Sequence, residues 1–443
     1  MDPAAPPANP QPSAAAEEVV DLCRDLLRID SSNYGDGSGP GERAAAEYVA
    51  ERLADVGLEP EIVESEPGRT SLMVRLQGED PSRDALLLHG HLDVVPANAA
   101  DWRVDPFSGE IRDGCVWGRG AVDMKDMDAM ILSVVRSRVR EGRKPPRDVV
   151  VLFLADEEAG GRFGGHWLVE KKRDWFDGCT EAVGEVGGFS LTTPAGRLYL
   201  VETAEKGIAW LKLTARGRAG HGSMVNDDNA VTLLAEAVAA IGRHRFPVRL
   251  TKTVRRLLDE LADAYGIDVD PDNPAALLDR LGSLAIIVGA TLRNSAQPTM
   301  LQAGYKHNVI PGDAAAYIDG RFLPGYEDEF LAQIDALLPP GVTREHIVRD
   351  IALETDFEGH LVDAMAAAIT EHDPGARVVP YCLSGGTDAK AFSLLGIRGF
   401  GFAPLQLPPD LDFAGMFHGV DERVPVDGLR FGARVLDRFL DLA

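Results

Sequence analysis

The chain has 443 residues, a hydrophobic fraction of 45% and a formal net charge of −25. This length is too great for one ordinary core, so we expect two or three domains. The negative charge would repel a phosphate backbone and argues against nucleic-acid binding, and the sequence has no run of 18 apolar residues that would predict a membrane span.

The N-terminus and the cysteines predict the compartment. Residues 1–16 are rich in Pro and Ala, which favours a disordered tail, and they have neither the basic nor the apolar region of a signal peptide. Cys23, Cys115, Cys179 and Cys382 are far apart and form no CxxC pair. We interpret them as reduced thiols and expect a cytoplasmic protein.

Helix and strand patterns alternate over the first part of the chain. Apolar spacing predicts helices over 41–57 and 124–139, and strands over 71–76 and 85–91. Residues 148–155 form a continuous apolar strand, as expected where helices cover both faces of a sheet. This is an α/β pattern, in which active residues gather at the carboxyl ends of strands.

The pattern changes near residue 206. The predicted elements that follow are an exposed strand (208–217), a helix (229–242), a polar helical stretch (250–282) and two strands (283–292 and 313–322). We therefore predict a smaller α+β domain, residues 206–321, inserted into a larger α/β domain made of residues 17–205 and 322–443. The last helix is predicted to begin after Asp427 as its N-cap.

Two histidines and an aspartate end the predicted strand at 85–91. Strand alternation places His89, His91 and Asp93 on one side. A metal-ligating histidine usually needs its second ring nitrogen held by a carboxylate or a carbonyl, and Asp93 is placed to do this for His91. A loop histidine with a nearby counter-charge fits the motif equally well.

Further carboxylates follow turns or strands. Asp123 comes after a glycine-rich turn and just before a helix, where it could bind an ion or only cap the helix. In "ADEEAGG", one of Glu157 and Glu158 could ligate a metal while the other acts as a general base; a solvated acidic loop is the alternative. Glu185 precedes two glycines in "VGEVGGFS", and His418 lies near the C-terminus.

Five residues together form a plausible ligand set: His91, Asp123, Glu158, Glu185 and His418. Two histidines and three carboxylates are suitable ligands for a pair of zinc-like ions bridged by one carboxylate. Each motif is weak by itself, whereas their joint occurrence at predicted strand ends is hard to obtain by chance.

The motif series HLD, GRGAVDMK, DEEAGG, E-x-GG, GHGS and FHG resembles the aminoacylase, glutamate carboxypeptidase and succinyl-diaminopimelate desuccinylase family of co-catalytic zinc hydrolases. The motifs occur in the family order and span residues 85 to 425. The resemblance implies a zinc-peptidase-like catalytic domain, with a mixed central sheet flanked by helices, and a lid or dimerisation domain. It also implies two zinc ions per subunit, replaceable by cobalt or manganese, and a homodimer formed through the inserted domain.

The resemblance implies a role for each ligand. Asp123 would bridge the two metals. One site would be completed by His91 and Glu185, and the other by Glu158 and His418.

Other residues would assist the reaction. Asp93 would orient His91, and Glu157 would be the general base that takes a proton from the bridging water. His221, in the inserted domain, would help to stabilise the tetrahedral oxyanion, often in the partner subunit's active site. Asp156 is expected to be only a solvated or hydrogen-bonded acid.

Four residues match family positions that contact the substrate. Asn308 and Arg321 match positions that bind the substrate carboxylate, for which an arginine fork is suited; a surface strand charge is the alternative for Arg321. Gly386 and Thr387 lie in a Gly-Gly-Thr loop whose amides could bind a terminal carboxylate, or which is only a turn. Asp126 stands where many relatives have glycine, and it could cap the helix or alter the surroundings of the metal.

These observations predict a cytoplasmic dizinc amidohydrolase that cleaves a peptide or N-acyl amide next to a free carboxylate, in dipeptides, other small peptides or N-acyl amino acids. The first alternative is an N-succinyl or N-acetyl amino-acid deacylase of amino-acid biosynthesis. A non-catalytic binding protein on the same fold is disfavoured because all five ligands and Glu157 are present. A single-metal aminopeptidase would be expected to lack the Glu157–Glu158 pair.

Overall fold

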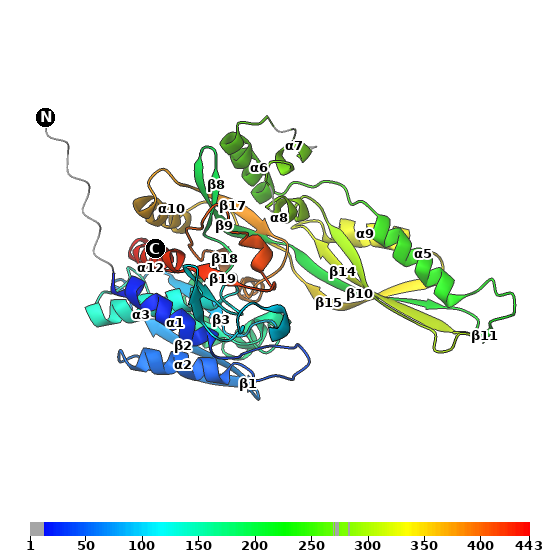
Figure 1. Cartoon of the computed structure of the whole chain (residues 1–443), viewed down its shortest axis with the longest axis horizontal. Coiled ribbons are helices and arrows are strands. Elements are labelled where there is room, and N and C mark those ends of the chain that lie inside the picture. Colours follow the sequence, from blue (N-terminus) through cyan, green and yellow to red (C-terminus); the bar gives the residue numbers. More distant parts are fainter. Residues whose placement is uncertain (1–12, 269, 271–273, 282–283) are drawn as a thin grey trace. The chain divides into compact units, whose positions relative to one another are not determined.

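The computed structural model describes residues 13–443 except 269, 271–273 and 282–283. The chain divides into two compact units, whose elements are labelled in Figure 1. Unit 1 is formed by residues 1–201, 358–378 and 391–443, and unit 2 by residues 202–357 and 379–390. The assignment of these parts as a catalytic domain and a lid stays a prediction.

The large sheet of unit 1 supplies the strand ends near which the candidate site lies. Its strands are β1 (Glu61–Glu66), β2 (Arg69–Leu76), β3 (Ala85–His91), β6 (Val149–Leu154), β7 (Cys179–Gly184), β8 (Phe189–Thr193), β9 (Gly196–Glu205) and β18 (Arg398–Gly401). Their order is β1-β2-β6-β3-β7-β18-β9, continued by β16 (Leu353–Glu354), with β8 and β17 (Arg377–Leu383) also paired to β9. Pairs β3–β6, β3–β7 and β7–β18 are parallel, whereas β1–β2, β2–β6 and β8–β9 are antiparallel. The sheet is therefore mixed, as predicted.

Helices flank this sheet. Helix α3 (Lys125–Glu141) packs against β3, and α1 (Ala14–Leu27) and α12 (Val426–Leu442) pack against α3 (Figure 1). Helix α2 (Arg43–Ala54) packs against β2, and α10 (His360–His372) against α12. All six residues of β6 are buried, as expected for a strand covered on both faces. The predicted α/β class is confirmed.

The remaining elements outside unit 2 are short. They are α4 (Gly165–Lys171), α11 (Ala389–Ser393), β17 (Arg377–Leu383) and a three-stranded sheet of β4 (Glu110–Arg112), β5 (Cys115–Trp117) and β19 (Arg423–Pro425). Two of them, α11 and β17, cross the boundary between the units.

Unit 2 is built on an antiparallel sheet of order β12-β14-β10-β15. These four strands are β10 (Gly207–Arg216), β12 (Ser295–Ala303), β14 (Asp313–Phe322) and β15 (Val342–Asp350). Separately, β11 (Gly220–His221) pairs with β13 (Val309–Ile310), and β16 (Leu353–Glu354) pairs with β9. Its helices are α5 (Ala230–Arg243), α6 (Lys252–Tyr265), α7 (Ala275–Leu278), α8 (Leu284–Ala290) and α9 (Glu327–Leu337). Helix α5 packs across all four strands and closes a core that includes Leu211, Phe322 and Phe330.

One prediction in this region needs correction. The sequence predicts a strand over 283–292, but Leu284–Ala290 form helix α8. Periodicity cannot distinguish a short apolar strand from a buried helical segment, which explains the error. The polar stretch 250–282 contains α6 and α7, and five of its positions lie outside the described residues.

Two helix starts also differ from the sequence analysis. Helix α12 begins at Val426 with Pro425 in the cap position, because β19 runs directly into it; Asp427 lies in the first turn. Helix α1 begins at Ala14, within the predicted disordered tail, because the Ser13 hydroxyl accepts the Ala16 N–H and caps it. The rest of that tail, residues 1–12, lies outside the described residues.

Two observations concern the predicted thiol state and the absence of a predicted membrane span. All four cysteines are free, as expected for reduced thiols. Among the residues that the structure describes, no helix combines the length and the apolar composition needed to span a bilayer.

Gly90 provides a test of how β3 packs on α3. A Cβ at this position would stand 2.2 Å from the buried carboxylate of Asp128. We expect Gly90→Ala to lower the free energy of unfolding by about 1–3 kcal/mol, because neither backbone nor acid has room to move. Denaturant unfolding measures this change.

Gly242→Ala on α5 is the control for that experiment. Its Cβ would meet Pro298 at an ordinary 3.6 Å, so stability should stay unchanged or rise. An unfolding midpoint for Gly90→Ala equal to that of the control would contradict the close packing of β3 on α3.

Candidate metal centre

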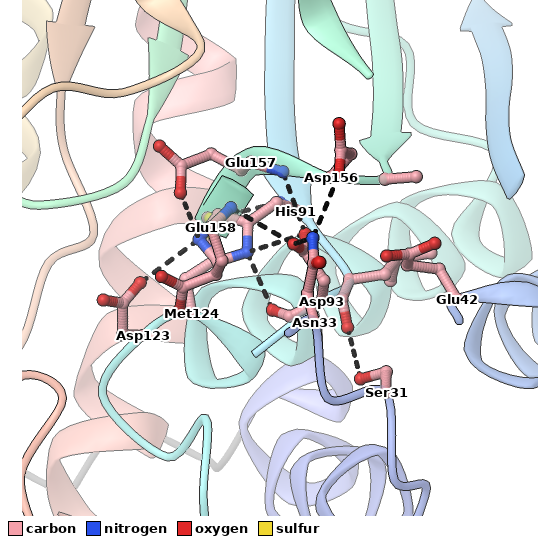
Figure 2. Close-up of polar contacts among 12 residues, drawn as sticks. Ser31, Asn33, Glu42, His91, Asp93, Asp123, Met124, Asp156, Glu157 and Glu158 are labelled. Atoms are coloured by element: carbon pink, nitrogen blue, oxygen red, sulfur yellow. Dashed lines mark hydrogen bonds and ion pairs between the residues drawn. The ribbon is translucent and has the colours of Figure 1, made fainter. Parts of the chain in front are cut away.

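Neighbouring strand ends of unit 1 bring the predicted ligands together. His91 ends β3, Glu158 follows β6 and Glu185 follows β7. Since these strands are parallel neighbours, their carboxyl ends meet at one edge of the sheet. Asp123 just before α3 and His418 in the loop before β19 complete the group, and Figure 2 shows His91, Asp123 and Glu158 converging.

Asp123 lies between the two histidines. Its Oδ1 is 3.2 Å from His91 Nε2, and its Oδ2 is 3.2 Å from His418 Nε2. On the first side, Glu185 Oε2 lies 3.4 Å from His91 Nε2; on the second, Glu158 Oε2 lies 3.0 Å from His418 Nε2. One carboxylate thus faces two imidazole–carboxylate pairs, the connectivity of two sites that share one ligand.

The donor atoms fit divalent metals in type and spacing. His91, Glu157 and Glu185 offer atoms within 4.8 Å of one another, and so do His91, Asp123 and Glu158. Imidazole nitrogens with carboxylate oxygens suit zinc, cobalt and manganese. So many acids in a buried group would repel one another without positive charge to offset them.

The acids shift the pKa of both histidines. Burial would by itself lower the pKa of His91, but the surrounding carboxylates, led by Glu185, raise it well above its ordinary value. Hydrogen bonds to Asp123 and Glu158 raise the pKa of His418 to about 10. Burial in turn raises the pKa of Glu158. In the metal-free cluster these shifts favour the positively charged form of both histidines.

Asp93 holds the loop that carries the two glutamates. Its carboxylate accepts the N–H groups of Glu157 and Glu158, each at 3.1 Å (Figure 2). His91 Nδ1 donates to the main-chain oxygen of Asp93 at 2.9 Å, whereas the carboxylate lies 3.6 Å away. Asp93 therefore holds the second ring nitrogen of His91, as the motif predicts, and of the two expected kinds of acceptor it uses its main-chain carbonyl.

Two acids outside the ligand set support the surrounding loops. Asp156, expected to be solvated or hydrogen-bonded, is buried, and Asn33 Nδ2 and the Phe163 N–H donate to it at 3.0 and 2.8 Å. Glu422 is fully buried and accepts the Val122 and Asp123 N–H groups at 2.6 and 3.1 Å.

Arg119 joins Glu422 to the loop of His418. Its Nη1 donates to Glu422 at 2.6 Å and its Nη2 donates to the Gly419 carbonyl at 2.8 Å. Glu422 and Asn33 were missed by the sequence analysis. The acid that follows closely on His418 in "FHGVDE" was the signal that could have pointed to Glu422.

Two residues near the predicted ligands, His89 and Asp126, are not part of the ligand set. His89 packs edge-on against Phe392, with ring centroids 4.8 Å apart, and burial lowers its pKa to about 3. Asp126 is buried, which raises its pKa well above the ordinary value, and one of its oxygens has no hydrogen-bond partner among the described residues. The Met127 N–H, in the first turn of α3, makes a hydrogen bond to Asp126, which is in keeping with the suggested capping role.

His221 and Asn308 lie close together in unit 2. His221, on β11, pairs with Val309 of β13, and the Gly222 N–H donates to the Asn308 carbonyl at 2.9 Å. The Ser223 N–H donates to His221 Nδ1 at 3.3 Å, and the Ser223 hydroxyl lies 2.8 Å from the same nitrogen. With Nδ1 as the acceptor, Nε2 of this exposed ring carries the proton and can donate a hydrogen bond.

The other predicted substrate-binding residues make contacts within unit 2. Arg321 donates from Nε and Nη2 to Asp319 at 2.7 and 3.2 Å. Thr387 donates its N–H and its hydroxyl to the buried Glu205 at 3.0 and 2.6 Å. A Cβ on Gly386 would stand 2.5 Å from the Lys390 amine, so this loop passes close to the lysine side chain. Their binding of substrate stays a prediction.

Comparisons with known proteins agree with this geometry. The family model described as Peptidase family M20/M25/M40 matches residues 87–442. Aminoacylase-1 from Sus scrofa is 28% identical over 422 residues, which cover 91% of this chain and 90% of the relative. The N-fatty-acyl-amino acid synthase/hydrolase PM20D1 from Xenopus tropicalis is 26% identical over 439 residues, with coverages of 93% and 83%.

Solved structures share the fold. The M20 family metallo-carboxypeptidase Sso-CP2 from Sulfolobus solfataricus aligns with a TM-score of 0.73 at 19% identity, covering 96% of this chain and 99% of the other.

Zinc binding to the metal-free protein should release about two protons at pH 7.5, because His91 and His418 must lose their protons to become ligands. Affinity should accordingly rise with pH. Titration calorimetry in buffers of different ionisation enthalpy measures the release. His418→Ala should release about one proton fewer, and a wild-type release near zero would contradict the raised pKa values.

Proposed function

Because the chain belongs to Peptidase family M20/M25/M40, we propose that it cleaves the amide bond next to a free carboxylate in N-acyl amino acids or small peptides. It is a metal-dependent hydrolase of peptide or N-acyl amide bonds, which confirms the enzyme class and the family resemblance predicted from the motifs. The names of the two relatives, which refer to acylated amino acids, favour N-acyl amino acids as the first substrates to test.

The position of Glu157 carries the proposal. Its Oε2 lies 3.8 Å from His91 Nε2, and its backbone N–H is held by Asp93. A carboxylate held there can take a proton from a water that attacks the amide carbon and can pass it to the leaving nitrogen. Its neighbour Glu158 faces His418 instead. The two adjacent acids would thus have separate tasks.

The metal ligands form two sets that share Asp123. We assign His91 and Glu185 to one ion and Glu158 and His418 to the other, with zinc as the expected metal and cobalt or manganese as substitutes. When bound, such ions polarise the carbonyl and lower the pKa of a water molecule.

Residues of unit 2 would recognise the substrate. His221, with its proton on Nε2, would donate to the oxyanion, while Asn308, Arg321, Gly386 and Thr387 would bind the carboxylate. Arg321 already holds Asp319 through Nε and Nη2, so a substrate carboxylate would have to bind through Nη1 or take the place of Asp319.

Assembly and location belong to the same proposal. We expect a homodimer through the inserted domain and a cytoplasmic location, which the four free thiols support. An N-succinyl or N-acetyl deacylase of amino-acid biosynthesis is the alternative. Comparing hydrolysis of dipeptides with hydrolysis of N-acetyl and N-succinyl amino acids distinguishes the two.

Glu157→Gln should keep its metals while kcat falls about 10²–10⁴-fold, because only the base is lost. The measurement is hydrolysis of dipeptides and of N-acetyl and N-succinyl amino acids with zinc, cobalt or manganese, together with metal content. Glu170→Gln, at an exposed position, is the control. Turnover near that of the control would remove Glu157 from its role, and a metal-loaded wild type that cleaves nothing would contradict the substrate class.

Arg321→Ala should raise KM about tenfold or more for substrates with a free carboxylate, and much less for their amidated analogues, because it removes a charge-assisted hydrogen bond. Arg344→Ala is a matched control. Arg344 lies on β15 of the same sheet and, like Arg321, holds an aspartate through Nε and Nη2. Equal losses on both substrate types would exclude carboxylate recognition by Arg321.

A further inference from the structure

We propose that Asn33 is a positioning residue that sets the Glu157–Glu158 loop by donating to two buried carboxylates at once. The inference deepens the proposed function and rests on it, because the loop carries the residue proposed as general base.

Asn33 lies between two buried acids (Figure 2). Its Nδ2 donates to Asp93 Oδ2 at 2.8 Å and to Asp156 Oδ1 at 3.0 Å. An amide nitrogen has two protons, so both are used. The two acids are 0% and 2% exposed, and buried carboxylates need such donors.

The opposite end of the amide is fixed as well. Asn33 Oδ1 accepts the Arg69 Nη2 at 2.8 Å and the Gly35 N–H at 3.0 Å. Because Arg69 and Gly35 can only donate here, they bind the oxygen of the amide and leave its nitrogen facing the acids. Arg69 is itself held by an ion pair with the buried Glu42. Every hydrogen-bonding position of the Asn33 side chain is therefore occupied.

The two acids hold the loop from its two ends. Asp93 accepts the N–H groups of both Glu157 and Glu158, and Asp156 Oδ2 accepts the Phe163 N–H at 2.8 Å. Asp156 also has a positive φ of 69°, an uncommon conformation that surrounding contacts must maintain. By joining these acids, Asn33 fixes the backbone from which both glutamates project.

Asn33→Asp is the sharpest variant. It keeps the size of the side chain and the acceptor toward Arg69, but it replaces the donating nitrogen with a carboxylate oxygen beside two other carboxylates. Asn98→Asp adds the same charge at an exposed position and serves as the matched control.

In Asn33→Asp we expect kcat to fall about 100-fold while KM stays within about threefold, because the base is misplaced and the substrate contacts are intact. Amide hydrogen exchange across residues 155–163 should accelerate about tenfold in the metal-free protein. The control should change neither quantity. Hydrogen exchange reports on the order of the loop and does not require turnover. It therefore tests the positioning role even if the wild type cleaves none of the substrates. That absence of cleavage would count against the proposed function and not against the positioning role.

A folded Asn33→Asp protein with the kcat and exchange rates of the control would overturn the proposal. If Asn33→Asp does not fold, Asn33→Ser decides, since serine adds no charge and leaves one donor. A fall in kcat of about tenfold, with faster loop exchange, would support positioning. Control-level values in Asn33→Ser, or failure of both variants to fold, would assign Asn33 to stability instead.

Discussion

The mutual repulsion of carboxylates at one edge of the unit 1 sheet governs this structure. Asp123, Glu157, Glu158 and Glu185 come together around two histidines, largely out of water. Such a group is held in place only if other charges and donors oppose it. The contacts of these acids with His91 and His418 provide such opposition in the metal-free protein, and divalent ions would take over that role when bound.

A second layer of buried acids uses main-chain N–H groups to hold the ligand loops. Asp93 collects the amides of the glutamate loop, and Glu422 collects those of the Asp123 loop. By accepting these main-chain N–H groups, both acids fix the backbone of the ligand loops. They do so without restricting the side chains of the ligands themselves. Neutral or cationic partners, Asn33 and Arg119, complete the two arrangements. The ligand positions therefore depend on polar contacts as much as on packing of the sheet.

Much of the fold and the ligand cluster could be predicted because their signals are local. Continuous apolar runs marked β3 and β6, and each ends in the acids or histidine that the site uses. The helix α8 could not be separated from a strand, since an apolar run of that length fits both. Asn33 and Glu422 were missed because, apart from Gly35, the partners of their side chains lie 36 to 303 positions away, a relation that residue spacing does not encode. The motif predicted Asp93 as the partner of His91 but left open which of its oxygens accepts, because a motif names a residue and the backbone decides which atom is near.

The link between Glu422 and the Asp123 loop bears on the order in which a ribosome makes this protein. The two segments are about 300 positions apart, and Glu422 lies close to the end of the chain. A nascent polypeptide therefore exposes Asp123 long before the acid that orients its loop, and before His418, have been synthesised. The Asp123 loop can therefore take its final geometry only after a further 300 or so residues, up to Glu422, have been added to the chain.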